Sequence, residues 1–175
     1  LQLDITIEGL RIQMMDDEAR PMFDLGSPKL KNYAEEMLRT IGATVAQVPN
    51  RVSVAGHTDS RTYSAGRTEY SNWELSADRA NAARRALAQR MPRDVKFGRV
   101  VGLADSVPYD REDPFNAANR RISIVVLNEA TERAIGIREG LETKAQDLEA
   151  AEENAMTKAE APDVPRVEDP AADPV

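Results

Sequence analysis

The stretch Arg51-Val52-Ser53-Val54-Ala55-Gly56-His57-Thr58-Asp59 decides the fold of this chain. Its two valines alternate with small or polar residues, which predicts a strand over 51–56 with one buried face. Three polar side chains follow directly where that strand ends. In layered folds of strands and helices, ligands collect beyond strand ends that face the start of a following helix. The stretch therefore predicts both a strand of the sheet and a binding site at its end.

A helix is expected after this strand. Ser71 and Glu74 have the spacing of a capping box, which predicts a helix from about residue 72 to residue 90, and Pro92 stops it. The residues predicted for its inner face are mostly small: Ala80, Ala83, Leu87 and Met91. Small side chains on that face allow a helix to lie close to a sheet.

Two strands and a further helix are expected before residue 51. Residues 3–7 alternate apolar and polar side chains, as in a half-buried strand, and the alternation resumes over 10–14 after Gly9, where we expect a bulge or a tight hairpin. Phe23 and Leu25 are expected to point inward. Ser27 and Pro28 have the residue types of an N-cap and a first helical position, so a helix is predicted from there to Pro49.

The remaining pattern predicts an α+β protein whose helices cover one face of a mixed sheet. Two more strands are expected over 95–103 and 122–127, the second with the clearest pattern. We divide the chain into a leading strand and linker (1–26), a domain (27–128) and an acidic tail (129–175), helical and solvated at first and then disordered.

Composition narrows the function. The chain has 175 residues, a net charge of -7 and a pI near 4.9, so it lacks the basic surface that nucleic acid requires. It contains no cysteine, which excludes disulfides and thiolate metal sites. No run of about 18 apolar residues is present. The sequence opens within a predicted strand at Leu1, so we expect a fragment or a processed chain, with any membrane anchor upstream.

The side chains of Asp59 and Arg79 suggest the chemistry of the site. A carboxylate accepts from an ammonium group, and the planar fork of an arginine binds a carboxylate with two hydrogen bonds. Side by side, the two groups would suit the zwitterionic head of an amino acid. They would equally suit each other, as a structural ion pair, and spacing alone does not choose between these readings.

Catalytic and metal chemistries find weaker support. His57 is the single histidine, and one histidine without placed carboxylates builds no metal site. Ser60 and Ser64 lie near it, but no nucleophile elbow exposes either serine. Asp59 with Glu69 or Glu74 could form a carboxylate pair for glycan cleavage, although carboxylates are common in this chain. We expect no metal, no cofactor and no enzymatic activity.

Four motifs in order give a resemblance to a known family. They are Gly56-His57-Thr58-Asp59, Asn72-x-x-Leu75-Ser76-x-x-Arg79-Ala80, Gly102 with Pro108, and Asn119-Arg120-Arg121-Ile122. Together they cover roughly residues 45–127 and resemble the OmpA-like peptidoglycan-binding domain. The stretch 70–82 and the long loop between Asp59 and Asn72 resemble the periplasmic part of the MotB type of flagellar stator subunit within that superfamily.

The resemblance implies a βαβαβ-type, two-layer fold whose pocket holds the diaminopimelate part of the peptidoglycan stem peptide. It assigns the side-chain ammonium to Asp59 and the carboxylate to Arg79. Thr58, Asn72 and Leu75 match positions that line the pocket, while Asn119 and Arg120 match a motif near the site that is partly structural.

The resemblance also implies the surroundings of the domain. Members of this family dimerise and anchor the flagellar motor stator to the cell wall from the periplasmic side of the inner membrane. The stator A subunit would be contacted through an upstream transmembrane segment that is not in this sequence.

Three alternatives remain beside this interpretation. One is an outer-membrane anchor of the OmpA or Pal kind, which the stretch 70–82 disfavours. Another is a cell-wall hydrolase, for which the sequence offers neither a metal cluster nor a nucleophile elbow. The third, a coiled-coil adaptor acting through the tail, lacks sustained heptads.

Overall fold

The computed structural model describes residues 1–62, 70–91 and 96–136, all within one unit that ends at Ile137. Its centre is a five-stranded sheet of order β1-β2-β5-β3-β4. The strands are β1 (Gln2–Thr6), β2 (Gly9–Met15), β3 (Val52–Gly56), β4 (Phe97–Gly102) and β5 (Arg121–Leu127). The pair β3–β4 is parallel and all other neighbours are antiparallel, so the sheet is mixed. Most of the predicted tail, from residue 137, lies outside the described residues.

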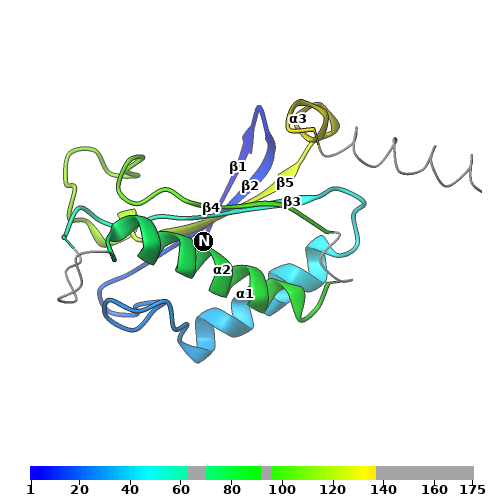
Figure 1. Ribbon diagram of the computed structural model, residues 1–175. Helices are drawn as coiled ribbons and strands as arrows, with labels where there is room; N and C mark the ends of the chain where they lie inside the picture. Colours follow the sequence, from blue (N-terminus) through cyan, green and yellow to red (C-terminus); the bar gives the residue numbers. More distant parts are fainter. Residues whose placement is uncertain (63–69, 92–95, 137–175) are drawn as a thin grey trace, which may run out of the picture. The chain divides into compact units, whose positions relative to one another are not determined.

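Two helices, α1 (Asn32–Val45) and α2 (Asn72–Ala88), lie on the same face of this sheet (Figure 1). A 3₁₀ turn, η2 (Ala117–Asn119), precedes β5, and a short helix, α3 (Glu129–Ala134), follows it. The predicted α+β class, with a mixed sheet and helices on one face, is confirmed. β2 runs antiparallel to β5 along its whole length, so the leading segment 1–26 contributes to the same sheet as residues 27–128.

Close packing of α2 on the sheet sets the position of the site. Ala80, Ala83 and Leu87 are fully buried and Met91 is nearly so, as the sequence predicted. A Cβ atom added to Gly56 of β3 would come within 2.1 Å of the carbonyl oxygen of Ser76. Only glycine therefore lets the helix backbone approach the end of this strand so closely.

The capping box at the start of α2 forms as predicted. Ser71 accepts from backbone amides of the first turn, and its own amide donates to Glu74 Oε2 over 2.7 Å. Local side-chain chemistry thus fixes where this helix begins.

The predicted start of the first helix is wrong by several residues. α1 begins at Asn32 with Lys31 at the N-cap, not at Ser27. The reason is tertiary: Phe23 and Leu30 form an antiparallel bridge, and the amide of Lys31 donates to the carbonyl of Met22 over 2.8 Å. The segment 22–31 is therefore a tight loop that folds back on itself ahead of the helix.

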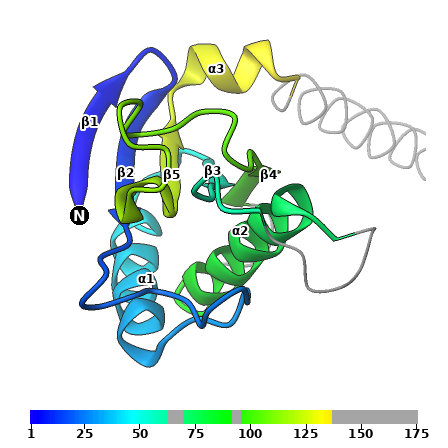
Figure 2. The ribbon, with the colours of Figure 1, turned by 90° about the vertical axis from the view of Figure 1, so that its left-hand side faces the viewer.

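The first strands form the tight hairpin that Gly9 suggested, with Gly9 at a φ of +139°. Their burial differs from the expectation for a half-buried strand. β1 is an edge strand, and Leu3, Ile5 and Ile7 are 61%, 92% and 95% exposed. The alternation is present, but β1 lies at the edge of the sheet, where neither helix covers it (Figures 1 and 2). Leu25, predicted to point inward, is also fully exposed, whereas Phe23 is buried as predicted.

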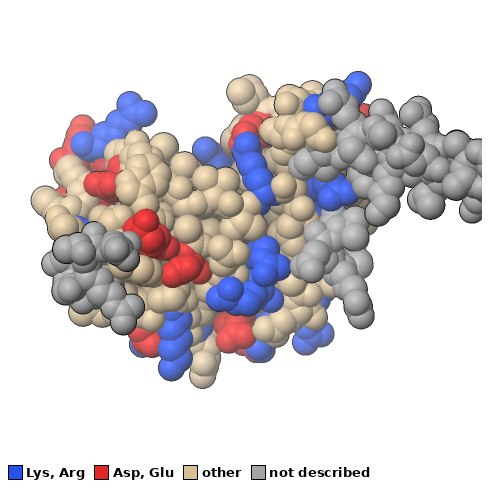
Figure 3. Space-filling model, in the orientation of Figure 1, with Lys and Arg blue, Asp and Glu red and all other residues tan. Residues whose placement is uncertain are grey.

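Figure 3 shows one face of the molecule, coloured by charge. On the face shown in Figure 3, acidic and basic groups lie among uncharged ones without a broad field of one sign. Among the described residues, no helix has both the length and the apolar character needed to cross a bilayer.

Candidate functional site

One end of the sheet carries a pocket of about 680 Å³, where β3 ends and α2 begins (Figure 2 looks onto this end). We call it the strand-end pocket. Its walls come from the loop after β2, the loop after β3, the start of α2 and the residue before β5. The lining residues are Asp16, Pro21, Phe23, Asp24, Leu25, Gly26, Lys31, Thr58, Asp59, Arg61, Thr62, Asn72, Leu75, Arg79 and Arg120.

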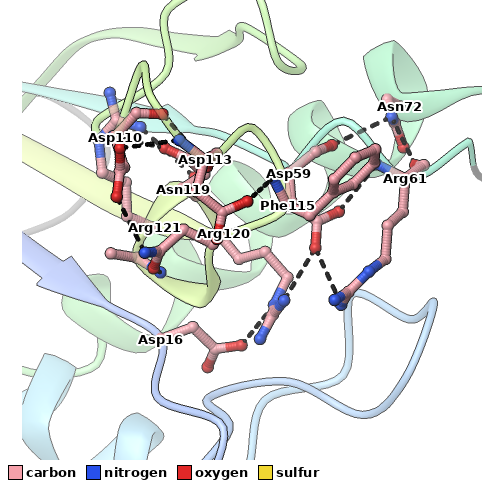
Figure 4. A network of polar contacts seen from close by, with 12 residues as sticks. Asp16, Asp59, Arg61, Asn72, Asp110, Asp113, Phe115, Asn119, Arg120 and Arg121 are labelled. Carbon is pink, nitrogen blue, oxygen red and sulfur yellow. Dashed lines mark hydrogen bonds and ion pairs between the residues drawn. The ribbon is translucent and has the colours of Figure 1, made fainter.

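Asp59 is buried in this pocket and its carboxylate is held by two arginines (Figure 4). Arg120 Nη1 donates to Asp59 Oδ2 over 2.8 Å, and Arg61 Nη1 reaches the same oxygen over 3.4 Å. The backbone amide of Arg61 donates to Oδ1 over 3.3 Å. The two arginines differ in exposure, because the side chain of Arg120 is 18% exposed and that of Arg61 is 59% exposed.

Arg79 projects from α2 into the same pocket and is 5% exposed. Its Nε donates to the carbonyl of Ser27 over 3.1 Å, and its guanidinium lies 4.7 Å from the centre of the Phe23 ring. Burial lowers the pKa of Arg79, and the nearby carboxylates of Asp16 and Asp59 partly oppose that shift. Two residues of segment 22–31 thus hold this guanidinium: the Phe23 ring lies against its face, and the Ser27 carbonyl accepts from its Nε.

Asp59 and Arg79 do not form an ion pair with each other. The carboxylate pairs with Arg61 and Arg120 instead. Within the part of the chain that the structure describes, no carboxylate lies within ion-pair distance of Arg79. The mutual ion pair that the sequence allowed is therefore absent, and the two groups line one pocket without neutralising each other.

Thr58, Asn72 and Leu75, the other predicted lining residues, are all found in the wall of the pocket. Thr58 is buried, and its Oγ1 has no hydrogen-bond partner among the described residues. Asn72 Nδ2 donates to the carbonyl of Arg61 over 3.0 Å, which holds the loop after β3 against the start of α2. Leu75 is 4% exposed and gives the wall an apolar patch.

The two predicted residues of the last motif, Asn119 and Arg120, have different roles. Arg120 lines the pocket and bridges two carboxylates, because its Nε donates to Asp16 Oδ2 over 2.8 Å while Nη1 donates to Asp59. Asn119 is fully buried and is absent from the lining. Its Oδ1 accepts from the amides of Tyr109 and Asp110, and its Nδ2 donates to two carbonyls of the same loop, so it holds the loop before β5 (Figure 4).

Sequence reasoning missed several lining residues, among them Asp16, Lys31 and Arg61. Asp16 comes directly after β2, and its acidic position beyond a strand end was the one available clue. Lys31 pairs with Asp24 at the rim, in the loop whose fold the sequence did not predict. Arg61 lies two residues past the motif and would have been found by asking which cation neutralises Asp59.

Within the described parts of the chain, the residues considered for catalysis do not assemble into a catalytic group. His57 is buried, its Nδ1 has no hydrogen-bond partner among the described residues, and it does not line the pocket. Burial, together with the charges of Arg121 and Arg11, lowers the pKa of His57 to about 3, so the ring is neutral. Glu74 is used in the helix cap. Ser64 and Glu69 lie outside the described residues.

The profile of the OmpA family matches residues 22–121, which include the whole pocket apart from Asp16 and Pro21. Motility protein B of Escherichia coli strain K12 is 45% identical over 152 residues, 87% of this chain and 49% of that protein. The putative truncated flagellar export/assembly protein LafU of the same strain is 37% identical over 74% of this chain and 61% of its own length. The chain spans about half the length of Motility protein B.

Solved structures share the fold. The periplasmic domain of Helicobacter pylori MotB superposes with a TM-score of 0.63 at 17% identity, over 82% of this chain and 99% of that one. The cell wall anchor of the T6SS from Pseudomonas aeruginosa gives 0.60 at 24% identity, over 73% and 87%. With a family profile that covers more than half of its residues, and with this shared fold, the chain belongs to the OmpA family.

Proposed function

We propose that this domain binds peptidoglycan non-covalently, and that the strand-end pocket takes the diaminopimelate residue of the stem peptide. One observation carries the proposal: a buried carboxylate, Asp59, and a buried guanidinium, Arg79, line the same pocket and form no ion pair with each other. A ligand group that carries both an ammonium and a carboxylate complements these two charges.

On this proposal each of the two charges has a partner in the ligand. The ligand ammonium would donate to Asp59, whose position Arg120 fixes through its hydrogen bond. The ligand carboxylate would accept from Arg79, whose guanidinium is held in advance by the Ser27 carbonyl and the Phe23 ring. Because the protein holds both groups before binding, little side-chain entropy is lost when the ligand arrives.

The arrangement supports binding rather than bond cleavage. A general acid for glycan cleavage needs a carboxyl kept protonated by an apolar setting. Asp59 instead lies between the cationic side chains of Arg61 and Arg120, which is not an apolar setting. We therefore assign the domain to anchoring, with no bond made or broken.

The 45% identity to Motility protein B favours a stator subunit over an anchor of the OmpA or Pal kind. On this proposal the domain lies in the periplasm and tethers an inner-membrane stator complex to the cell wall. The stator A subunit would be contacted through a transmembrane segment outside this sequence, and the chain would act as a homodimer. Light scattering of the purified chain measures the last point directly.

Co-sedimentation with purified diaminopimelate-type sacculi tests the proposal. The native chain should pellet, whereas Asp59→Asn and Arg79→Met should remain in solution while keeping the native circular dichroism spectrum. Arg133→Met is the matched control, because it removes an exposed arginine from α3, at the opposite end of β5. Pelleting of all four proteins alike would place the binding site elsewhere. Release of soluble fragments from the sacculi would contradict the anchoring role.

A further inference from the structure

Asp59 is already satisfied before any ligand arrives. Its Oδ2 accepts from Arg120 and from Arg61, and its Oδ1 accepts from the amide of Arg61. Figure 4 shows the two guanidinium groups meeting the same carboxylate. A ligand ammonium that binds Oδ2 of Asp59 therefore has to share this oxygen with both guanidinium groups or replace one of them.

The two arginines differ in how firmly they are held. Arg120 makes two contacts of 2.8 Å, one to Asp59 and one to Asp16, and its side chain is 18% exposed. Arg61 makes one longer contact of 3.4 Å, and 59% of its side chain is exposed. An exposed, single-point ion pair contributes little and is screened by salt. Arg61 is thus the partner that Asp59 can release.

The charge inventory of the pocket points the same way. The lining contains four cationic side chains, Lys31, Arg61, Arg79 and Arg120, and three carboxylates, those of Asp16, Asp24 and Asp59. With Arg61 in place, the cationic side chains outnumber the carboxylates by one, which disfavours an incoming ammonium group. Without Arg61, the numbers of cationic side chains and carboxylates are equal.

We infer that the Arg61 guanidinium occupies the ammonium subsite of the free pocket, and that it acts as an internal competitor of the ligand. This inference rests on the proposed function. Binding exchanges the Arg61–Asp59 pair for an ammonium–Asp59 pair, while Arg120 and the backbone amide of Arg61 stay in place. The loop itself does not need to move, because the Arg61 carbonyl is tied to Asn72 independently of the side chain. Arg61 therefore sets the affinity for amine-bearing ligands and makes it depend on salt.

The test is an NMR titration of the whole chain with meso-diaminopimelate and, separately, with pimelate, which has the two carboxylates but no amine. Arg61→Ala should bind diaminopimelate about threefold to fivefold more tightly than the native chain at low salt, the size expected for one exposed ion pair. The gain should shrink as salt is added. Pimelate should gain nothing, since it offers no ammonium to Asp59. Arg133→Ala, with the same change in net charge on α3, should match the native chain.

Each result has one meaning. Unchanged or weaker diaminopimelate binding by Arg61→Ala, with a native chain that does bind, overturns the inference and leaves the proposed function standing. Equal tightening toward pimelate also overturns it, because the effect would then not pass through the ammonium. If the native chain, Arg61→Ala and Arg133→Ala all fail to bind diaminopimelate, and all fail to pellet with sacculi, the proposed function falls and the inference falls with it.

Discussion

Arg120 donates through Nη1 to Asp59 over 2.8 Å, and this contact joins the residue before β5 to the loop after β3. The same guanidinium holds Asp16, from the loop after β2, at an equal distance. Burial alone would lower the pKa of Arg120, but the two carboxylates raise it above its ordinary value. Three chain segments thus meet at one half-buried cation, which positions the wall of the strand-end pocket.

Replacing Arg120 by methionine should destabilise the domain by roughly 2 to 4 kcal/mol, because the buried carboxylate of Asp16 would lose its arginine partner and that of Asp59 would lose the nearer of its two. Urea denaturation followed by circular dichroism measures the change. Arg111→Met removes an exposed arginine and should cost less than about 0.5 kcal/mol. Equal stability of the two variants would mean that the bridge contributes nothing to folding.

Asn119→Ala should lower the free energy of unfolding by about 2 to 3 kcal/mol, because buried amides and carbonyls of the loop before β5 would be left unpaired. Since Asn119 is absent from the pocket lining, the folded variant should bind sacculi within about twofold of the native affinity. A loss of binding without a loss of stability would show that Asn119 belongs to the binding site. Asn81→Ala on α2, which removes a single side-chain bond, serves as the control.

The stability of the domain should depend on His57 at acidic pH. Its pKa falls from 6.5 to about 3 on folding, because the ring is buried beside Arg121 and Arg11. Below pH 6.5 the unfolded chain takes up a proton that the folded chain refuses, so the stabilisation present above pH 6.5 is lost as the pH falls toward 3.

Between pH 7 and pH 5 this difference amounts to about 2 kcal/mol. It should be missing in His57→Gln, whose other groups titrate as in the native chain. His57 is the single histidine, so urea unfolding of the two proteins at both values isolates its contribution. Parallel losses in the two proteins would show that His57 is not buried in its neutral form.

Gly56→Ala should both destabilise the domain, by about 2 kcal/mol, and weaken wall binding. The new Cβ would lie 2.1 Å from the Ser76 carbonyl, so α2 would have to move away from β3. That movement separates Arg79, on the helix, from Asp59, beyond the strand. Thermal unfolding and sacculus co-sedimentation measure the two effects. Retention of both properties would contradict the close contact between helix and strand.

Local patterns gave the parts of the fold that depend on neighbours in sequence. The capping box at Ser71 and Glu74 placed the start of α2, and the alanines of its inner face foretold close packing on the sheet. Ser27 and Pro28 have residue types that are equally suited to a helix start. Their segment nevertheless forms a loop, because the antiparallel bridge between Phe23 and Leu30 folds its backbone back on itself. Propensity is a weak preference that tertiary pairing overrides.

By itself the sequence determined the α+β fold and the strand end where the pocket opens, because periodicity and caps act over short ranges. Six of the pocket's lining residues followed from the chemistry of Asp59 and Arg79 and from the resemblance of the motifs to a known family. Only the tertiary structure decided which cation neutralises Asp59. Spacing left Arg79 open as an ion-pair partner of Asp59, but the partners are Arg120, 61 positions away, and the neighbouring Arg61. Electrostatic pairing depends on distance in space, and the antiparallel pairing of β3 with β5 brings Arg120 to the end of β3.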